Sequence, residues 1–264
     1  MMSPATPLDL KGKRILVTGA CGGIGGGAAT IFAQLGAQVF LADINAAGMA
    51  TACEATGAVG GLATDITKPE ECDAAVAAAV KAMNGLDGMF NPAGVGDPVE
   101  KALDLDLADW RRVIDINLWG LFLMCRSAGR VMTQQGSGSI VSIASVNGIS
   151  GIPRRHAYGP SKAGVIQLTR TLACEWAANG VRVNSIAPGY IRPPAGEHRL
   201  VLSGKTKLDT LNDRIPLGRR GEVAEVGRAA AFLLSDWASY ITGALLPVDG
   251  GWTAYGGAGA VRVA

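Results

Sequence analysis

Two side chains near the middle of the sequence could exchange a proton with a substrate. Tyr158 and Lys162 are four residues apart in a segment predicted to be the first turn of a helix, and this spacing places them on one helix face. Pro160 indicates that the helix begins here, because proline is tolerated in a first turn but not in a helix interior. A phenol has an ordinary pKa of about 10, too high for a base at neutral pH. A fixed ammonium nearby favours the phenolate, so the pair could act in general acid–base catalysis.

A hydroxyl group lies thirteen residues upstream of this tyrosine. Ser145 follows the apolar run 140–144, which we predict to be a strand. A serine at the end of a strand and a phenol at the start of the next helix can meet over the same substrate oxygen. On their own, a Tyr and a Lys four residues apart are more typical of a helix surface. The catalytic interpretation therefore depends on the rest of the chain.

A glycine-rich turn near the N-terminus predicts a phosphate-binding loop. The β-branched run 14–17 leads into Thr18-Gly-Ala-Cys-Gly-Gly-Ile-Gly25, and helical periodicity follows as far as Leu35. Strand, glycine turn and helix, in this order, are the context in which such a pattern indicates dinucleotide binding. Gly19 permits the tight turn, and Gly23 lets the backbone approach a pyrophosphate at the helix N-terminus. Gly25 lets the helix pack closely on the strand.

The next predicted strand, 38–42, ends in Asp43. A carboxylate at this position can accept both ribose hydroxyls of NAD and repels the 2′-phosphate of NADP, and Gly22 offers no cation to offset that repulsion. The sequence therefore predicts NAD. Cys21 lies in the same loop and could be a redox-active thiol. The simpler interpretation is a small residue that fits a glycine turn, because nothing nearby in the sequence would lower its pKa.

The rest of the chain alternates predicted helices and strands. This alternation predicts an α/β protein with a doubly wound parallel sheet, a seven-stranded Rossmann fold with helices on both faces. No shift in composition divides residues 1–264, so we expect a single NAD-binding domain, with a substrate lid in the irregular segment of about 192–216. The remaining predicted strands are 58–63, 86–90, 138–144, 181–187 and 244–248, and the remaining helices are 46–55, 69–83, 106–134, the helix opened by Tyr158, and 222–234.

Residues that could bind a ligand follow these strands. In sheets of this kind the ligand lies outside the carboxyl ends of the strands, at the point where the strand order reverses. We therefore expect the strand-end residues to surround one site. They are Gly19, Asp43, Asp65, Asn91, Ser145 and Pro188.

Composition excludes several other functions. Twenty-four Lys and Arg against twenty-two Asp and Glu leave a formal charge of +2, which gives no argument for nucleic acid or an anionic membrane as a partner. No apolar run approaches the roughly 18 residues of a membrane span. The N-terminus lacks the basic start and apolar stretch of a signal peptide, and the five scattered cysteines suit a reducing cytoplasm. With two histidines and no zinc-ligand spacing, we expect no metal.

Together these features resemble the short-chain dehydrogenase/reductase family, in its compact NAD-preferring branch, over roughly residues 12–251. The motifs that carry the resemblance are the T-G-x-x-x-G-I-G loop, the N-x-A-G turn at 91–94, Asn117 inside a long helix, Ser145, the Y-x-x-x-K pair, P-G-x-I at 188–191 and D-G-G at 249–251.

The resemblance implies a role for each matching residue. Tyr158 would be the general acid and base, and Ser145 would orient the substrate oxygen. Lys162 would lower the pKa of the tyrosine and bind the nicotinamide ribose, while Asn117 would hold a water in a proton relay. Asp65 and Ile66 would face the adenine, and the backbone of Ile191 would meet the carboxamide. The full set of implied cofactor contacts is Gly19, Gly23, Ile24, Asp43, Asp65, Ile66, Asn91, Gly94, Tyr158, Lys162, Pro188 and Ile191.

Two positions depart from the family pattern. Pro92 replaces the second Asn of N-N-A-G and removes an amide that ties neighbouring strands together, and Pro193 replaces a Thr that often bonds to the cofactor. Both affect the expected detail of cofactor binding and neither belongs to the catalytic group.

The resulting prediction is an NAD-dependent oxidoreductase that interconverts a secondary alcohol and a ketone, on a polyol, sugar or hydroxy-acid substrate. The spacing of the Tyr–Lys pair argues against enoyl reductases, in which the two residues lie further apart. The alternative is a non-catalytic NAD-binding scaffold or redox sensor on the same fold. Apolar residues on the helix that holds Asn117 and on the helix opened by Tyr158 exceed what one sheet face should cover. By resemblance, these helices would pair with their copies in a homodimer or homotetramer.

Positively charged residues near the expected entrance of the substrate site suggest an anionic substrate. Arg154 and Arg155 precede Tyr158, and Arg192 opens the expected lid. One interpretation is that one of them binds an anionic substrate such as a hydroxy acid. The other is a solvated loop whose cations never meet the ligand.

Overall fold

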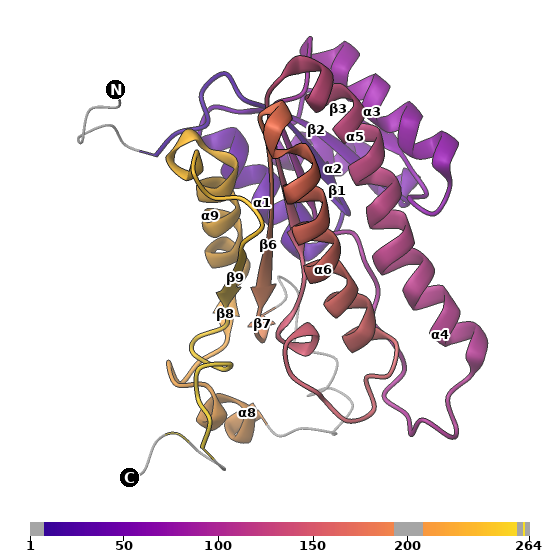
Figure 1. The fold of residues 1–264 in the computed structure, drawn as a ribbon, viewed down its shortest axis with the longest axis vertical. Coiled ribbons are helices and arrows are strands. Elements are labelled where there is room, and N and C mark those ends of the chain that lie inside the picture. Colours follow the sequence, from indigo (N-terminus) through magenta and orange to yellow (C-terminus); the bar gives the residue numbers. More distant parts are fainter. Residues whose placement is uncertain (1–7, 193–207, 258–260, 262–264) are drawn as a thin grey trace.

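The computed structural model describes residues 8–192, 208–257 and 261. A seven-stranded sheet lies at its centre, in the order β3-β2-β1-β4-β5-β6-β9, and every neighbouring pair is parallel (Figure 1). This confirms the predicted doubly wound sheet. Its strands are β1 (Arg14–Thr18), β2 (Gln38–Asp43), β3 (Gly60–Ala63), β4 (Gly88–Asn91), β5 (Gly138–Ile143), β6 (Val181–Pro188) and β9 (Leu245–Val248).

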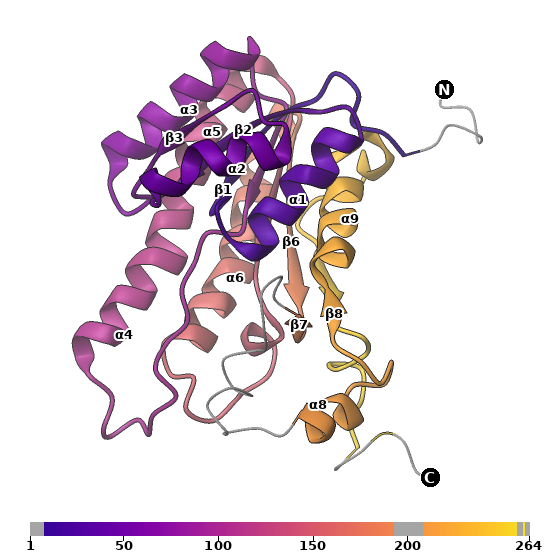
Figure 2. The ribbon, with the colours of Figure 1, turned by 180° about the vertical axis from the view of Figure 1, so that it is seen from behind.

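Helices cover both faces of the sheet, as predicted. One face carries α3 (Pro69–Met83), α4 (Leu107–Ile114), α5 (Leu121–Gln135) and α6 (Tyr158–Trp176), seen in front in Figure 1. The other carries α1 (Gly23–Gln34), α2 (Met49–Thr56) and α9 (Val223–Leu234), seen in front in Figure 2. The described residues also form four short 3₁₀ turns: η1 (Ala46–Gly48), η3 (Val146–Gly148), η4 (Ala177–Asn179) and η5 (Asp236–Ala238).

Each face of the sheet has its own apolar core, and alternate strand residues divide between them. Leu16 and Met89 pack with α3, α5 and α6, whereas Ile15, Val17 and Phe90 pack with α1 and α9. Successive side chains of a strand point to opposite faces. Because both faces are buried, the strands of a parallel sheet are apolar throughout instead of alternating with polar residues. This explains why the strands could be recognised in the sequence as short apolar runs.

The predicted helix 106–134 is not one regular helix. It divides into α4, a π-helical stretch η2 (Asp115–Gly120) and α5. A π-turn fits one residue more than an α-turn and is frequent at functional sites. Asn117 lies in this stretch, so the sequence prediction was wrong about the regularity of the helix around it. The periodicity of apolar residues does not reveal such a stretch, because the helix continues with nearly the same direction on both sides.

The expected lid is described only in part. Residues 193–207, which include Pro193, lie outside the described residues. Arg192 belongs to β7 (Ile191–Arg192), which pairs with β8 (Gly221–Glu222), and α8 (Leu208–Arg214) is a helix where we expected irregular structure. Seven residues are too few to show helical periodicity in a sequence. These elements lie beyond the carboxyl ends of β6 and β9 (Figure 1). Within the described ranges, no helix has both the length and the apolar character needed to span a membrane.

Candidate active site

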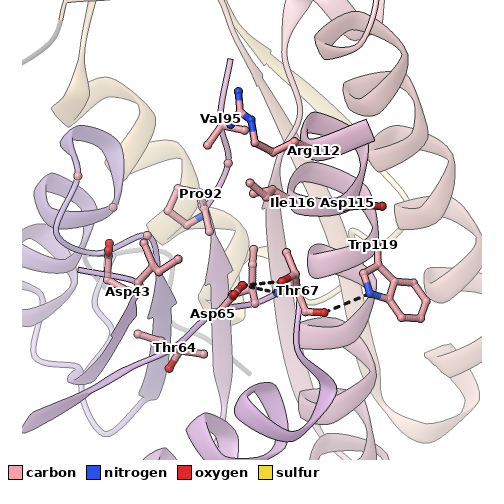
Figure 3. A pocket seen from close by; sticks show the side chains of 18 of the residues that line it. Asp43, Thr64, Asp65, Thr67, Pro92, Val95, Arg112, Asp115, Ile116 and Trp119 are labelled. Carbon is pink, nitrogen blue, oxygen red and sulfur yellow. Dashed lines mark hydrogen bonds between the residues drawn. The ribbon is translucent and has the colours of Figure 1, made fainter. Parts of the chain in front are cut away.

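The strand order reverses between β1 and β4, and a pocket of about 1320 Å³ opens at their carboxyl ends (Figure 3). The glycine loop, the ends of β2 and β3, the turn after β4 and one side of α4 and η2 line this pocket. The predicted residues Gly19, Gly23, Ile24, Asp43, Asp65, Ile66 and Gly94 all line it.

The glycine loop has the shape that a pyrophosphate requires. Gly19 has a φ of 58°, which favours glycine, and a side chain there would bring its Cβ within 2.8 Å of the Cα of Ala93. A Cβ at Gly25 would collide with the carbonyl of Gly19. Helix α1 begins after Gly22, which supplies no side-chain cap, and its first residues line the pocket. The backbone N–H groups of a first turn lack partners within the helix, so this end of α1 fits a phosphate group.

The carboxylate of Asp43 is held in place by two backbone donors. The N–H of Cys21 donates to Oδ2 at 2.9 Å and the N–H of Asn45 donates to Oδ1 at 2.9 Å. An ionised carboxylate has about four lone-pair sites, so two remain for ribose hydroxyls. Burial and the nearby charge of Asp43 raise the pKa of the Cys21 thiol, which favours the small-residue interpretation over a reactive thiol.

The turn that follows β3 lines the pocket next to Asp43. Oδ1 of Asp65 accepts from Thr67 twice, from Oγ1 at 2.7 Å and from the backbone N–H at 3.0 Å. The side-chain hydrogen bond is the largest of the effects that lower the pKa of Asp65. The indole of Trp119 donates from Nε1 to the carbonyl of Thr67 at 3.3 Å (Figure 3). Asp65, Ile66 and Trp119 therefore line the same part of the pocket, and the predicted contact of Asp65 and Ile66 with the adenine stays a prediction.

Asn91 lies beneath the pocket and does not line it. Its side chain is buried, with Oδ1 accepting from Thr18 Oγ1 at 3.3 Å. The same Thr18 hydroxyl accepts from the N–H of Ala93 at 3.4 Å. Asn91 thus supports the turn, while Pro92, Ala93 and Gly94 present it to the pocket. Thr18 was not a predicted site residue, although it opens the glycine motif.

Ser145 and Tyr158 meet beside this pocket. Ser145 follows β5, and its buried hydroxyl accepts from the N–H of Asn147 at 3.2 Å. Tyr158 is the first residue of α6. Burial raises the pKa of the Tyr158 phenol, while hydrogen bonding with Ser145 and the positive charge of Arg155 act to lower it. The predicted encounter of a strand-end serine with a helix-start tyrosine is present.

Lys162 is buried one helical turn further along α6. Its Nζ donates to the carbonyl of Ile143 at 2.8 Å and lies 5.7 Å from the centroid of the Tyr158 ring. Burial lowers the pKa of Lys162 to about 8. Ser145 and Arg155 act to lower the phenol pKa in this arrangement, and the predicted effect of Lys162 on that pKa stays a prediction.

Asn117 ties the turn after β4 to α6. Its Oδ1 accepts from the N–H of Val95 at 2.8 Å, and its Nδ2 donates to the carbonyl of Val95 at 2.9 Å and to Ser161 Oγ at 3.1 Å. A Cβ at Gly94 would lie 2.9 Å from Asn117 Oδ1 and 3.5 Å from Lys162 Nζ, so glycine fits there. Asn117 therefore joins the cofactor turn to the catalytic helix, and its role in holding a water stays a prediction.

Pro188 and Ile191 lie further from the glycine loop, because β4 and β5 separate β6 from β1 in the sheet. Pro188 closes β6 opposite Val248, and Ile191 pairs with Gly221. Neither residue lines the pocket at the glycine loop, so their predicted contacts with the cofactor stay predictions.

Of the three candidate arginines for an anionic substrate, two form ion pairs. Arg155 Nη1 lies 2.7 Å from Asp97 Oδ1, and Arg192 Nη1 lies 3.5 Å from Glu222 Oε1. Arg154 is exposed, with a φ of 66°. For Arg155 this pairing favours a structural role over binding of an anionic substrate.

Comparison with known proteins decides the family. A family model described as Enoyl-(Acyl carrier protein) reductase matches residues 19–253. Galactitol 2-dehydrogenase (L-tagatose-forming) of Cereibacter sphaeroides is 41% identical over 259 residues, which cover 96% of this chain and 100% of the relative. The chain belongs to the short-chain dehydrogenase/reductase family. This confirms the resemblance found in the sequence.

Other relatives and solved structures agree. Cis-4-hydroxycyclohexanecarboxylate dehydrogenase of Sinomonas cyclohexanicum is 40% identical, covering 90% of this chain and 96% of the relative. The NAD⁺-bound crystal structure of xylitol dehydrogenase matches with a TM-score of 0.86 and 32% identity over 92% of this chain and 99% of that one. The chain spans only 44% of another relative, an uncharacterized short-chain type dehydrogenase/reductase of Sinorhizobium fredii. The named dehydrogenases support oxidoreduction at CH–OH groups.

Several residues around this short-chain dehydrogenase/reductase site were not predicted. Thr67, Trp119 and Asp97 make contacts between segments far apart in the chain, and their local sequence carries no motif. Pro92 was predicted only as a departure, and it lines the pocket. Among the described residues, no cluster of three or more His, Cys, Asp or Glu side chains could hold a metal ion.

Proposed function

We propose that this chain is an NAD-dependent dehydrogenase that interconverts a secondary alcohol and a ketone by hydride transfer. The observation that carries the proposal is the position of Ser145 after β5 and of Tyr158 at the start of α6, beside a glycine-loop pocket. This places a group that can exchange a proton next to a hydroxyl that can bind the substrate oxygen.

The chemistry divides between cofactor and protein. When bound, NAD supplies the acceptor for the hydride that leaves the carbinol carbon. Ser145 and Tyr158 bind the substrate oxygen between them, and Tyr158 accepts the hydroxyl proton as the carbonyl forms. In the direction of reduction, Tyr158 returns that proton to the oxygen. The Lys162 ammonium holds positive charge beside the phenol, which favours its ionised form.

The residues present fit NAD. The bare N-terminus of α1 suits the pyrophosphate, and Asp43 keeps acceptor sites for the ribose. Two arginines line the same pocket and could in principle offset the repulsion of a 2′-phosphate. Both are already paired with carboxylates: Arg111 Nε lies 2.8 Å from Asp115 Oδ1, and Arg112 Nη2 lies 3.3 Å from Asp109 Oδ1. The balance of charge among the residues that line this pocket therefore supports NAD over NADP.

The proposed substrate is a neutral polyol or cyclic secondary alcohol. Relatives named for galactitol and for cyclohexanol support this class; the cyclohexanol dehydrogenase of Acinetobacter sp. (strain SE19) is 37% identical over 91% of this chain. The pairing of Arg155 and Arg192 agrees with a neutral ligand. A hydroxy acid is the second candidate, because Arg154 is exposed just before α6 and no ion pair of it is found within the described part of the chain.

A substrate panel tests both the activity and the substrate class. The protein is incubated with NAD and with cyclohexanol, galactitol or cis-4-hydroxycyclohexanecarboxylate, and formation of NADH is followed by absorbance. We expect turnover with at least one neutral alcohol. If NAD binds by calorimetry but no secondary alcohol is oxidised and no ketone reduced, the scaffold or sensor alternative replaces the proposal.

One variant separates the two substrate classes. Arg154→Ala should leave KM for neutral alcohols unchanged. A KM that rises at least fivefold for the carboxylate alone, with kcat less affected, would identify Arg154 as its binding residue and favour the hydroxy acid. Arg126→Ala, on the exposed side of α5, is the matched control.

We also place the protein in the cytoplasm as a homodimer or homotetramer. Exposed apolar side chains on and before α4 support assembly: Leu103 and Leu107 are 98% and 82% exposed, and Trp110 is partly exposed. We expected α6 to carry more apolar residues than one sheet face covers, but Val165, Ile166 and Leu172 are buried within the subunit. The exposed residues of α4 therefore carry this part of the proposal.

A further inference from the structure

A buried carboxylate from another part of the chain caps the catalytic helix. Asp97 lies in the turn after β4, and its side chain has no exposed surface. Its Oδ2 accepts from the N–H of Ala157 at 3.1 Å and from the N–H of Tyr158 at 2.9 Å, across about sixty residues of sequence. Helix α6 has no side-chain cap of its own at Ala157. Asp97 therefore satisfies first-turn donors of α6 and interacts favourably with the positive end of its dipole.

The same carboxylate holds a cation against the phenol ring. Oδ1 of Asp97 lies 2.7 Å from Nη1 of Arg155, and that Nη1 also donates to the carbonyl of Asp97 at 3.2 Å. The Arg155 side chain is only 16% exposed. Its guanidinium carbon lies 4.8 Å from the centroid of the Tyr158 ring, which is a cation–π geometry. One carboxylate thus fixes both the backbone of Tyr158 and the cation on its ring.

We propose that Asp97 and Arg155 are positioning residues of the reaction, which hold the Tyr158 phenol in place and set its proton affinity through two opposed charges. This inference rests on the proposed function only in that it assigns Tyr158 as the group that exchanges the proton. The contacts themselves do not depend on the substrate.

The charges that face Tyr158 come from several segments. Arg155, just before α6, favours the phenolate, and Asp97, from the turn after β4, disfavours it. Ser145, after β5, favours the phenolate by hydrogen bonding, and Lys162 lies one turn along the same helix. Arg155 also acts to lower the pKa of Tyr190, which follows β6. Because Asp97 and Arg155 together are neutral, removing either one exposes Tyr158 to the uncompensated charge of the other.

This arrangement distinguishes a positioning pair from a substrate-binding arginine. A substrate carboxylate would have to displace Asp97, whose buried charge would then lose its partner at a large free-energy cost. A positioning pair acts on every substrate alike. Loss of Arg155 should therefore change kcat/KM for neutral alcohols and for anionic alcohols by the same factor.

The decisive experiment titrates the phenol directly in two variants. Asp97→Asn keeps an oxygen that can cap α6 and removes the negative charge, while Arg155→Met removes the positive charge and keeps much of the packing. Ultraviolet difference titration, with each variant measured against its Tyr158→Phe counterpart, isolates this tyrosine from Tyr190, Tyr240 and Tyr255. We expect the pKa to fall in Asp97→Asn and to rise in Arg155→Met, by about one pH unit each.

Two controls keep the result interpretable. Arg155→Lys retains the charge, so the pKa of Tyr158 should stay close to that of the parent. Arg170→Met removes an exposed arginine from α6 and should leave the pKa of Tyr158 unchanged. If Asp97→Asn does not fold, as judged by circular dichroism, the difference between Arg155→Met and Arg155→Lys decides the matter. Shifts of both charge variants in the same direction, or equal titration of Arg155→Met and Arg155→Lys, would overturn the proposal.

The kinetic readout adds the link to catalysis. The basic limb of kcat/KM should move with the titrated pKa in each variant, whereas a purely structural loss would lower the rate at every pH without moving the limb. The titration needs no turnover. If the protein oxidised no alcohol, the proposed function would fail while opposite shifts of the phenol would still support the positioning pair.

Discussion

Lys162 donates a hydrogen bond from Nζ to the carbonyl oxygen of Ile143, 2.8 Å away, at the last residue of β5. Ser145 follows two residues later in the chain. The lysine thus reaches from the helix of Tyr158 to the strand that presents the serine, and it carries its charge into a buried site. Burying an ammonium costs free energy. The catalytic arrangement should therefore reduce the stability of the fold.

The first prediction concerns the free-energy cost of burying the Lys162 ammonium. Burial lowers the pKa of Lys162 from 10.5 to about 8, so between these values the unfolded chain binds more protons than the folded one. The free energy of unfolding should therefore rise with pH across this window. Below it, Lys162→Met should be more stable than the parent by up to about 3 kcal/mol, and this advantage should shrink as pH rises from 8 toward 10.5.

Urea denaturation of parent and variant at several pH values checks this prediction. Lys101→Met, at an exposed loop position, is the control and should show no such pH-dependent difference. A Lys162→Met protein that is less stable than the parent at pH 7, by an amount that does not change with pH, would show that the bond to Ile143 outweighs the burial of charge.

The second prediction concerns proton exchange. Tyr158→Phe removes the hydroxyl and keeps the ring on which Arg155 packs. The turnover number should fall by roughly 10²- to 10⁴-fold, the usual contribution of a general acid or base. NAD affinity, measured by calorimetry, should remain within a few-fold. The control Tyr240→Phe changes a fully exposed tyrosine and should leave the turnover number unchanged. A Tyr158→Phe enzyme that turns over within a few-fold of the parent would exclude Tyr158 as the base.

The third prediction concerns cofactor choice. Asp43→Ala removes the acceptor for the ribose and also releases the N–H groups of Cys21 and Asn45. The free energy of NAD binding should weaken by roughly 1–3 kcal/mol. The ratio of kcat/KM for NAD to that for NADP should fall, because the repulsion of a 2′-phosphate is lost. The ratio of kcat/KM for the two cofactors is the measurement, with Asp104→Ala in an exposed loop as control. A parent protein that uses NADP as well as NAD contradicts the assignment.

The fourth prediction concerns assembly through α4. The parent should scatter light as a dimer or tetramer at micromolar concentration. Leu107→Glu places a charge on an exposed apolar surface and should shift the population toward smaller species. Val59→Glu, at an exposed position before β3, should not. Monomeric parent protein at micromolar concentration would contradict assembly, whatever the variants do.

The fold and most of the pocket could be predicted because each feature is encoded locally. The apolar runs predicted the strands, and the strand-end positions predicted that Gly19, Asp43 and Asp65 would face one site. The meeting of Ser145 with Tyr158 followed from the same geometry. These inferences need only the rule that parallel strands end at one edge of the sheet.

The missing parts depend on contacts between distant segments. Asp97 lies in a loop without periodicity, and only the folded chain brings it to the N-H groups of Tyr158. The direction of the Lys162 side chain, with Nζ bonded to the carbonyl of Ile143 and 5.7 Å from the centroid of the Tyr158 ring, is likewise decided by packing. The side chain of Asn91 likewise finds a distant partner in Thr18, and its predicted contact with the cofactor stays a prediction. A sequence motif names such residues but does not say which way they point.

The π-helical stretch Asp115–Gly120 makes the position of Asn117 depend on the length of this segment. An α-helix turns by about 100° per residue, and a π-turn takes up one residue more than an α-turn. Deleting one residue here would let the backbone close as a regular helix, and α4 and α5 would keep nearly the same rotation about the helix axis because the π-turn had taken up that residue. The side chain of Asn117 would then be displaced from Val95, while α5 kept its place in the core. A single-residue deletion in this stretch should therefore disturb the site much more than the fold.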